Sequence, residues 1–325
     1  MSNPNLYTIA WVAAVRVEFV AALSFLDEEH PQPAYIHPQD ENNYALGTIH
    51  GHKVVIATLP DAGYGVPDAS RVAQQVKLSF PNIQFGLMVG IGGGAPSRKN
   101  DIRLGDIVVG EPRDGDTGVF EYEVRDLGNQ LGKRISATRR LTPPPPVLRA
   151  AVAQLKRQYA NQGHRIPQAV EDVLAMGPRL RAEFQRPHPA TDRLFRSNVL
   201  CHSNSQGHDA ELAARSPRPT SDSTVIHYGT IASANRLMKD SSLRDQLITS
   251  ENVLCFEMEA AGLMDRDDFP CLVIRGICDY SDSHKNDVWQ GYAAMVAAAY
   301  AKDLLTLIAD KQSYGKSPLA SRHPH

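Results

Sequence analysis

The chain has 325 residues, with 34 basic and 36 acidic side chains and a formal net charge of −2. This length suits one large α/β domain or two ordinary domains. A nearly neutral chain has no general electrostatic attraction for nucleic acid or for an anionic membrane, so neither is expected as a partner.

The cysteines and the apolar runs indicate a soluble protein from a reducing compartment. Cys201, Cys255, Cys271 and Cys278 form no CxxC pair, and three of them lie in apolar, strand-like runs. No disulfide framework is therefore expected. The N-terminus lacks a basic region before its apolar run, and no stretch of about 18 uncharged apolar residues occurs. A cytoplasmic location is predicted.

Runs of β-branched and aromatic residues predict strands at 7–13, 54–59, 85–91, 106–110, 225–233, 253–258 and 271–277. Helical patterns are clearest at 68–80, 237–247, 259–264 and about 288–308. Strands that alternate with helices indicate a sheet covered on both faces, an α/β sandwich. The turn signal His50-Gly51 predicts an antiparallel hairpin among the early strands, so the sheet is expected to be mixed.

The composition changes between residues 142 and 222, where PPPP is followed by two helical patterns and by polar segments. Because the strands resume afterwards, this region is predicted to be an insertion in one domain of residues 1–312. Residues 139–196 carry eleven Arg or Lys against four acids, which suits either a solvated helical face or a surface that meets phosphate. Residues 313–325 are predicted to be a disordered tail.

A glycine-rich run, VGIGGGAP, covers residues 89–96 and contains G-x-G-x-x-A. A dinucleotide-binding loop of this kind opens directly into a helix that holds the pyrophosphate. Here a polar segment and another strand follow, so nicotinamide binding is not expected. The glycines serve either a tight turn or a close approach of the backbone to a ligand.

Four carboxylates interrupt apolar surroundings: Glu18, Glu257, Glu259 and Asp279. A carboxylate at the end of an inner strand lies at the edge where open α/β sheets place their ligands, and burial there raises its pKa. The alternative for each is a helix cap or a salt bridge, for instance between Asp279 and Arg275.

Together these acids suit cleavage of an N-glycosidic bond. That reaction passes through an oxocarbenium-like sugar and needs an acid for the departing base, an acceptor for the sugar hydroxyls and a base for the nucleophile. The twelve histidines show no HxxxH or HExxH spacing, so no metal site and no cofactor are expected.

Five ordered segments resemble the nucleoside phosphorylase and nucleosidase superfamily, and the resemblance extends from Tyr7 to about Ile308. It implies a three-layer α/β/α sandwich around a central mixed, partly barrel-like sheet. The details are most similar to fungal members that precede NACHT or ankyrin-repeat regions, whereas this domain is expected to stand alone. The segments are GLMVGIGGG, IRLGDIVVG, HYGTIASANRLMKD, CFEMEAAGLM and VIRGICDYSDSHKN.

The resemblance assigns roles to matching residues. It implies that Asp279 is the general acid that bonds a purine at N7, that Glu259 accepts hydrogen bonds from the ribose hydroxyls, and that Met258 and Ile91 lie beside the sugar. The base would contact Asp279 together with Gly92, Leu237, Met238 and Glu257. Since Leu237 and Met238 stand where relatives often have an aromatic residue, stacking would be weaker or come from Phe120 or Tyr122.

The nucleophile divides this superfamily into two classes of enzyme. Phosphorylases hold phosphate with basic and hydroxyl side chains, but this chain has Glu18 in the first loop and Met88 and Ile91 beside the glycines. A carboxylate repels phosphate and can take a proton from water, so Glu18 resembles the base of the methylthioadenosine and S-adenosylhomocysteine nucleosidases. Arg16 is the exception, because it could restore a contact to an anion or disturb the loop.

The expected function is therefore a purine nucleosidase that acts on adenosine, inosine or guanosine. If the basic insertion is a lid over the 5′ side, the substrate would be a 5′-phosphorylated form such as ATP. The alternatives are a purine nucleoside phosphorylase and a non-catalytic nucleotide-binding signalling domain. The family resemblance also implies a homo-oligomer, in which a neighbouring copy can complete the site.

Overall fold

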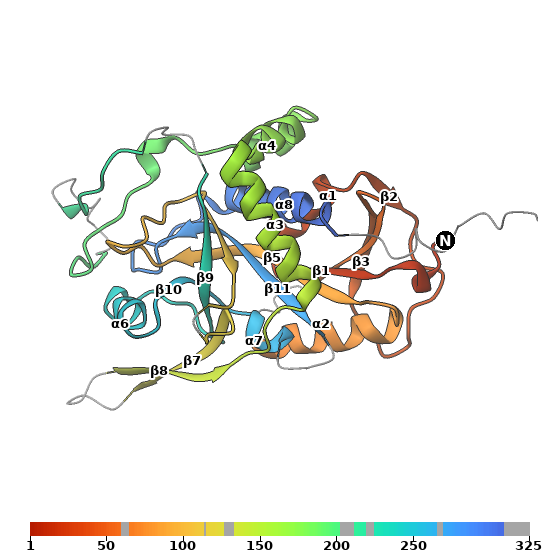
Figure 1. Ribbon diagram of the computed structural model, residues 1–325, viewed down its shortest axis with the longest axis horizontal. Helices are drawn as coiled ribbons and strands as arrows, with labels where there is room; N and C mark the ends of the chain where they lie inside the picture. Colours follow the sequence, from red (N-terminus) through yellow and green to blue (C-terminus); the bar gives the residue numbers. More distant parts are fainter. Residues whose placement is uncertain are drawn as a thin grey trace, which may run out of the picture.

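A mixed sheet runs through the centre of the computed structural model (Figure 1), which describes residues 1–59, 65–113, 115–126, 133–201, 211–218, 224–264 and 269–308. The expected tail at 313–325 lies outside these residues. The strands of the described part are β1 (Ile9–Ala13), β2 (Glu28–His30), β3 (Asn43–Ile49), β4 (His52–Thr58), β5 (Phe85–Gly94), β6 (Ile107–Gly110), β7 (Val119–Asp126), β8 (Lys133–Arg140), β9 (Ile226–Ser233), β10 (Val253–Glu257) and β11 (Cys271–Asp279).

The strand order β2-β3-β4-β1-β5-β11-β6-β9-β7-β8 describes an open sheet, except that β10 pairs with both β5 and β9. These two pairings close β5, β11, β6, β9 and β10 into a ring, which confirms the expectation of a partly barrel-like sheet. The pairs β1–β5 and β5–β11 are parallel, whereas β3–β4 and β6–β11 are antiparallel. The predicted mixed character is therefore also confirmed.

Helices cover both faces of the sheet (Figure 1). α8 packs on β5 and β11, and α1, α3, α4 and α5 contact α8; α2 and α7 pack together, and α6 lies beside β8 and β10. The helices are α1 (Arg16–Ser24), α2 (Val66–Ser79), α3 (Pro146–Gln162), α4 (Ile166–Leu174), α5 (Pro178–Phe184), α6 (Ser241–Glu251), α7 (Ala260–Leu263) and α8 (Gln290–Leu305).

The Ala-rich α8 is buried on nearly all sides, because helices from the 142–222 region cover its outer surface. Apolar residues of that region, among them Leu148 and Val152 of α3, belong to the main core cluster. On the inner side, a Cβ at Gly276 would lie 1.9 Å from the carbonyl oxygen of Ala293. Glycine in β11 thus lets α8 pack directly against the strand that ends in Asp279.

The structure confirms some predicted elements and corrects others. The hairpin at His50-Gly51 is present, and both residues have positive φ angles of 48° and 85°, as a tight two-residue turn requires. The strand predicted at 85–91 continues through the glycine run, so β5 ends only at Gly94 and the glycines do not form a tight turn. The helix predicted at 237–247 begins only at Ser241, because Asp240 caps its N-terminus. The β7–β8 hairpin was missed, since β8 is polar and largely exposed.

Candidate active site

A buried guanidinium stands at the centre of three buried carboxylates. Arg275 of β11 is fully buried, and its Nη1 lies 3.7 Å from Oε1 of Glu18. Its Nη2 lies 3.6 Å from Oε2 of Glu259 and forms a close ion pair with Glu257. We call Glu18, Glu257 and Glu259 around Arg275 the carboxylate cluster. It brings together residues from the first and last thirds of the chain.

Glu18 is fixed by three backbone N–H groups. It stands in the first turn of α1, and its Oε2 accepts hydrogen bonds from the N–H groups of Ala14 (2.6 Å) and Val15 (3.1 Å). Its Oε1 accepts one from the N–H of Ile91 in β5, at 2.8 Å. The helix start and the glycine strand therefore hold this carboxylate in one orientation.

Glu257 and Glu259 lie where β10 leads into α7. Glu257 accepts hydrogen bonds from the N–H groups of Glu259 (3.2 Å) and Ala260 (2.9 Å), so it satisfies the first donors of the helix. Glu259 is the N-cap residue, and its Oε1 accepts a hydrogen bond from the N–H of Gly65 at 3.4 Å. The other oxygen of Glu259 faces Arg275.

Burial and mutual repulsion keep protons on this cluster. Burial raises the pKa of Glu18 above its ordinary value, although Arg275 and the three backbone donors oppose the rise. Burial also raises the pKa of Glu259 to about 8, and the charges of Glu257 and Glu18 add to it. Burial alone would lower the pKa of Arg275, but the surrounding carboxylates raise it. The cluster can therefore exchange a proton near neutral pH.

Asp279 ends β11, as the sequence predicted, but its partner differs from the one considered. Its Oδ1 accepts a hydrogen bond from the N–H of Ser281 and its Oδ2 one from Nζ of Lys285, both at 2.8 Å. The alternative pairing with Arg275 is wrong, because Arg275 is occupied by the carboxylate cluster. Asp279 lies four residues farther along the same strand, and both residues pair with the glycine segment of β5.

The glycines of β5 make room for these acids. A Cβ at Gly90 would lie 2.1 Å from Oε1 of Glu18 and 2.5 Å from Nη1 of Arg275. A Cβ at Gly93 would lie 2.2 Å from Oγ of Ser281 and 2.7 Å from Oδ1 of Asp279. Bare backbone is thus needed because charged side chains pack directly on it.

Gly90→Ala is expected to lower the free energy of unfolding by about 1–3 kcal/mol, because the added methyl group overpacks the Glu18–Arg275 contact. Urea denaturation at pH 7 measures this change. Gly177→Ala is the matched control, since a Cβ there meets nothing within 4 Å and the change should stay within about 0.5 kcal/mol. Equal stability of the two variants would contradict close packing of Gly90 against Glu18 and Arg275.

The residues expected beside a sugar lie along the same strands. Ile91 contributes its N–H to Glu18, and its carbonyl oxygen lies 3.4 Å from Nη1 of Arg275. Met258 is half-buried between Glu257 and Glu259.

The residues expected beside a base are divided between surface and core. Leu237 is 39% exposed, whereas Met238 is buried in an apolar cluster with Phe120 and Tyr122. Gly92 packs against β10, since a Cβ there would lie 2.5 Å from Sγ of Cys255. Their contacts with a ligand remain predictions.

Sequence reasoning missed the central role of Arg275 and the ion pair of Lys285 with Asp279. The available signal for Arg275 was a single charge inside the apolar strand CLVIRGI, which requires buried partners. Arg16, considered as an anion contact, instead forms an ion pair with Glu183 of α5 on the surface.

The described residues contain no group of three or more His, Cys, Asp or Glu placed to hold a metal ion. Within the same residues, no helix has the length and apolar character needed to span a bilayer. Cys201, Cys255, Cys271 and Cys278 are all free thiols.

Residues 8–310 match the family model of the phosphorylase superfamily. The chain belongs to this superfamily. This confirms the family that the five sequence segments indicated.

Among curated proteins, the chain is 42% identical over 306 residues to a nucleotide-binding leucine-rich repeat (NLR)-like protein of Hyaloscypha variabilis. The match covers 94% of the chain but only 30% of that relative.

A shorter match is to ATP nucleosidase Cap17 of Escherichia coli, at 34% identity over 85 residues, which is 25% of this chain and 17% of the relative. Among solved structures, the futalosine hydrolase of Helicobacter pylori has a TM-score of 0.56 and 16% identity, over 92% of this chain and 97% of its own. The 5′-methylthioadenosine/S-adenosylhomocysteine nucleosidase of Neisseria meningitidis, in complex with methylthio-immucillin-A, has a TM-score of 0.57 and 15% identity, over 93% and 99%. At these identities, the likeness establishes the shared fold.

Proposed function

We propose that this superfamily member is a purine nucleosidase, which hydrolyses the N-glycosidic bond of a purine nucleoside or of a 5′-phosphorylated form such as ATP. The observation that carries this proposal is the carboxylate cluster. Glu18, Glu257 and Glu259 surround the single guanidinium of Arg275, so the group keeps a net negative charge even when Glu259 alone holds a proton. Such a site repels a phosphate nucleophile and accepts a water molecule.

Glu18 suits the role of general base. Three backbone donors fix its orientation, so the carboxylate is already in place to take a proton from a water molecule. Burial raises the pKa of Glu18 above its ordinary value, which makes this carboxylate a stronger base. Arg16 supplies no phosphate contact here, because its guanidinium is paired with Glu183.

Asp279 suits the role of proton donor to the departing base. As the bond between sugar and purine breaks, the base gains negative charge. Asp279 in its protonated form would give its proton to N7, and the carboxylate that remains would be paired with Lys285. Lys285 and the N–H of Ser281 hold the two oxygens of Asp279 in fixed positions. Glu259 would accept hydrogen bonds from the ribose hydroxyls, with Met258 against the sugar. The carboxylate cluster and Asp279 would thus act at the two ends of one bound nucleoside.

The names of relatives support hydrolysis of nucleosides or nucleotides. ATP nucleosidase Cap17 and the futalosine hydrolase and methylthioadenosine nucleosidase structures all carry names of N-glycosidic hydrolases. The Cap17 match favours including ATP among the substrates, next to adenosine, inosine and guanosine. A cytoplasmic homo-oligomer remains our expectation from the sequence.

The test is a mass-spectrometric screen of purine nucleosides and nucleotides, with and without phosphate. We expect release of free purine and of ribose or ribose phosphate in phosphate-free buffer, with no stimulation by added phosphate. The Asp279→Asn variant, purified in the same way, is the control for a contaminating nucleosidase. Loss of activity in this variant assigns the reaction to the protein itself. A requirement for phosphate, with ribose 1-phosphate as product, would assign phosphorolysis instead. Binding of a nucleotide without turnover would favour the signalling domain.

A further inference from the structure

The loop of residues 280–285 follows Asp279 directly, and its first three residues are buried. The backbone N–H of Ser281 and the ammonium group of Lys285, both in this loop, make the hydrogen bonds that hold the two oxygens of Asp279. Ser281 has a positive φ of 54°, which is uncommon for a residue with a side chain. The orientation of the Asp279 carboxylate therefore depends on the contacts that hold the 280–285 loop in this shape.

The 142–222 region holds the first residue of the loop. The hydroxyl of Tyr280 donates a hydrogen bond to the carboxylate of Asp192 and accepts one from Nη1 of Arg215 at 2.7 Å. Arg215 also donates to the carbonyl oxygen of Asp192 at 2.8 Å, so these two residues fix each other. Burial and the charge of Asp192 raise the pKa of Tyr280, so its hydroxyl keeps the proton that it donates.

Two further contacts join the same parts of the chain. The ring of Phe195 stacks on the ring of His284, with centroids 3.8 Å apart and an angle of 13° between the planes. The N–H of Cys201 donates a hydrogen bond to Oγ of Ser283 at 2.9 Å. Residues 192–201 therefore contact both the first residue of the loop and its second half.

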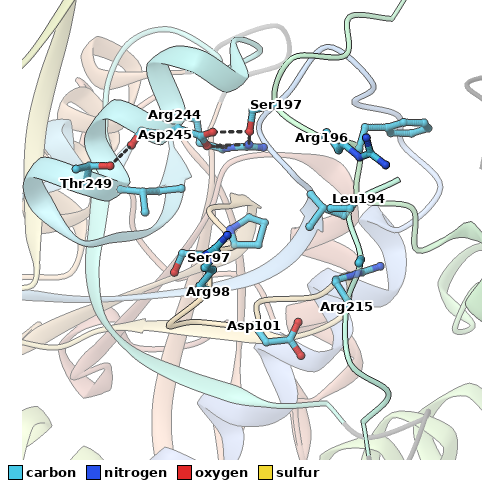
Figure 2. Close-up of a pocket in the computed structure, with 15 residues that line it drawn as sticks. Ser97, Arg98, Asp101, Leu194, Arg196, Ser197, Arg215, Arg244, Asp245 and Thr249 are labelled. Carbon is cyan, nitrogen blue, oxygen red and sulfur yellow. Dashed lines mark hydrogen bonds and ion pairs between the residues drawn. The ribbon is translucent and has the colours of Figure 1, made fainter. Parts of the chain in front are cut away.

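Arg244 of α6 joins the loop to the 142–222 region from another side. The Nη1 of this buried residue donates to the carbonyl oxygen of Tyr280 at 2.8 Å. Its Nη2 donates to Oγ of Ser197 at 3.0 Å (Figure 2). An ion pair with Asp245, at 2.8 Å, fixes the same guanidinium. The loop, α6 and the 142–222 region thus form one connected structure behind Asp279.

A proton donor has to stand within hydrogen-bond reach of the atom that it protonates, and a displacement of about 1 Å can cost about 10²-fold in rate. We propose that Tyr280, held by Asp192 and Arg215, is a positioning residue for Asp279, and that the 142–222 region contributes to catalysis through this contact. The inference rests on the proposed function, because Asp279 has to act as the proton donor.

Tyr280→Phe in the full chain tests the proposal, since it removes only the hydroxyl that Asp192 and Arg215 hold. We expect kcat for purine release to fall about tenfold while KM changes by less than about twofold, because the proton donor shifts and the acids of the carboxylate cluster do not. Asp192→Asn should give a similar loss. The double variant should be no slower than the slower single variant, because both changes break the same contact. Steady-state kinetics on the best substrate of the nucleoside screen measures these values.

Tyr159→Phe is the matched control. Tyr159 of α3 donates a hydrogen bond to Oδ2 of Asp303 at 2.7 Å, so this variant loses a bond of the same kind at a place outside the loop. Its kcat should match that of the wild type. An equal fall of kcat in Tyr159→Phe and Tyr280→Phe would assign the loss to general destabilisation and overturn the proposal.

Hydrogen–deuterium exchange follows the loop independently of catalysis. Residues 279–286 should exchange faster in Tyr280→Phe than in the wild type, whereas the carboxylate cluster should be unchanged. Unchanged exchange of the loop would overturn the proposal, as would a higher KM for a 5′-phosphorylated substrate with an unchanged kcat, the result expected of a lid. An inactive wild type would overturn the proposed function and the positioning role together. An active wild type with an unaffected Tyr280→Phe variant would overturn the positioning role alone.

Discussion

Asp279→Asn should lower kcat for purine release by about 10²–10⁴-fold while leaving the fold intact, because an amide of the same shape cannot deliver the proton at this position. The amide oxygen of the variant can still accept the hydrogen bond from the N–H of Ser281, so the loop keeps its shape. Steady-state kinetics on the best substrate of the nucleoside screen, together with circular dichroism, measures both effects.

Asp287→Asn is the control for this variant. Asp287 is exposed and accepts a hydrogen bond from Gln290 at the start of α8, so its rate should match that of the wild type. If Asp279→Asn retains full activity, the assignment of the proton donor fails. If both variants lose activity equally, the loss reflects the loop and not the acid.

Arg275→Met should lower the free energy of unfolding by about 3–5 kcal/mol, since it leaves three buried carboxylates without their cation. Methionine keeps much of the side-chain volume, so the loss comes mainly from charge and not from a cavity. Chemical denaturation at pH 8 gives the magnitude. Arg157→Met, on the exposed surface of α3, serves as the control and should change stability by less than about 0.5 kcal/mol.

The pH dependence separates this electrostatic cause from a packing defect. In the wild type the pKa of Glu259 is about 8, against 4.5 for an ordinary glutamate, so the folded state holds more protons and its stability falls as pH rises between these values. Without Arg275 the carboxylates hold their protons still more strongly. The deficit of Arg275→Met should therefore shrink toward pH 5 and grow toward pH 8. A deficit that stays constant with pH would indicate a packing defect.

Local sequence patterns predicted much of the fold because they report local preferences. The alternation of strands and helices indicated the sandwich, and the His50-Gly51 turn indicated the hairpin. Periodicity failed at β8, because an exposed, basic edge strand has no buried face to reveal it. It failed again at the start of α6. The apolar pattern begins at Leu237, but Asp240 is the N-cap residue, so the helix begins only at Ser241.

The residues of the candidate site could be predicted from the sequence, but the ion pairs between them could not. Glu18, Glu257, Glu259 and Asp279 were found as acids in apolar surroundings, since a buried carboxylate needs a reason to be there. The sequence did not show which cationic side chain pairs with each of these acids. Arg275 and Asp279 share one short stretch of sequence and were considered as a pair, yet the structure separates them.

The sequence by itself determined the family, the strand that ends in Asp279 and the set of acids available for chemistry, because motifs and apolar periodicity are properties of neighbouring residues. Only the tertiary structure decided that Arg275 belongs to Glu18, Glu257 and Glu259, and that Lys285 belongs to Asp279. Ion pairs in a low-dielectric interior depend on distances of a few ångströms. Those distances arise when β5, β10, β11 and α1 meet, and residues far apart in the chain then become neighbours.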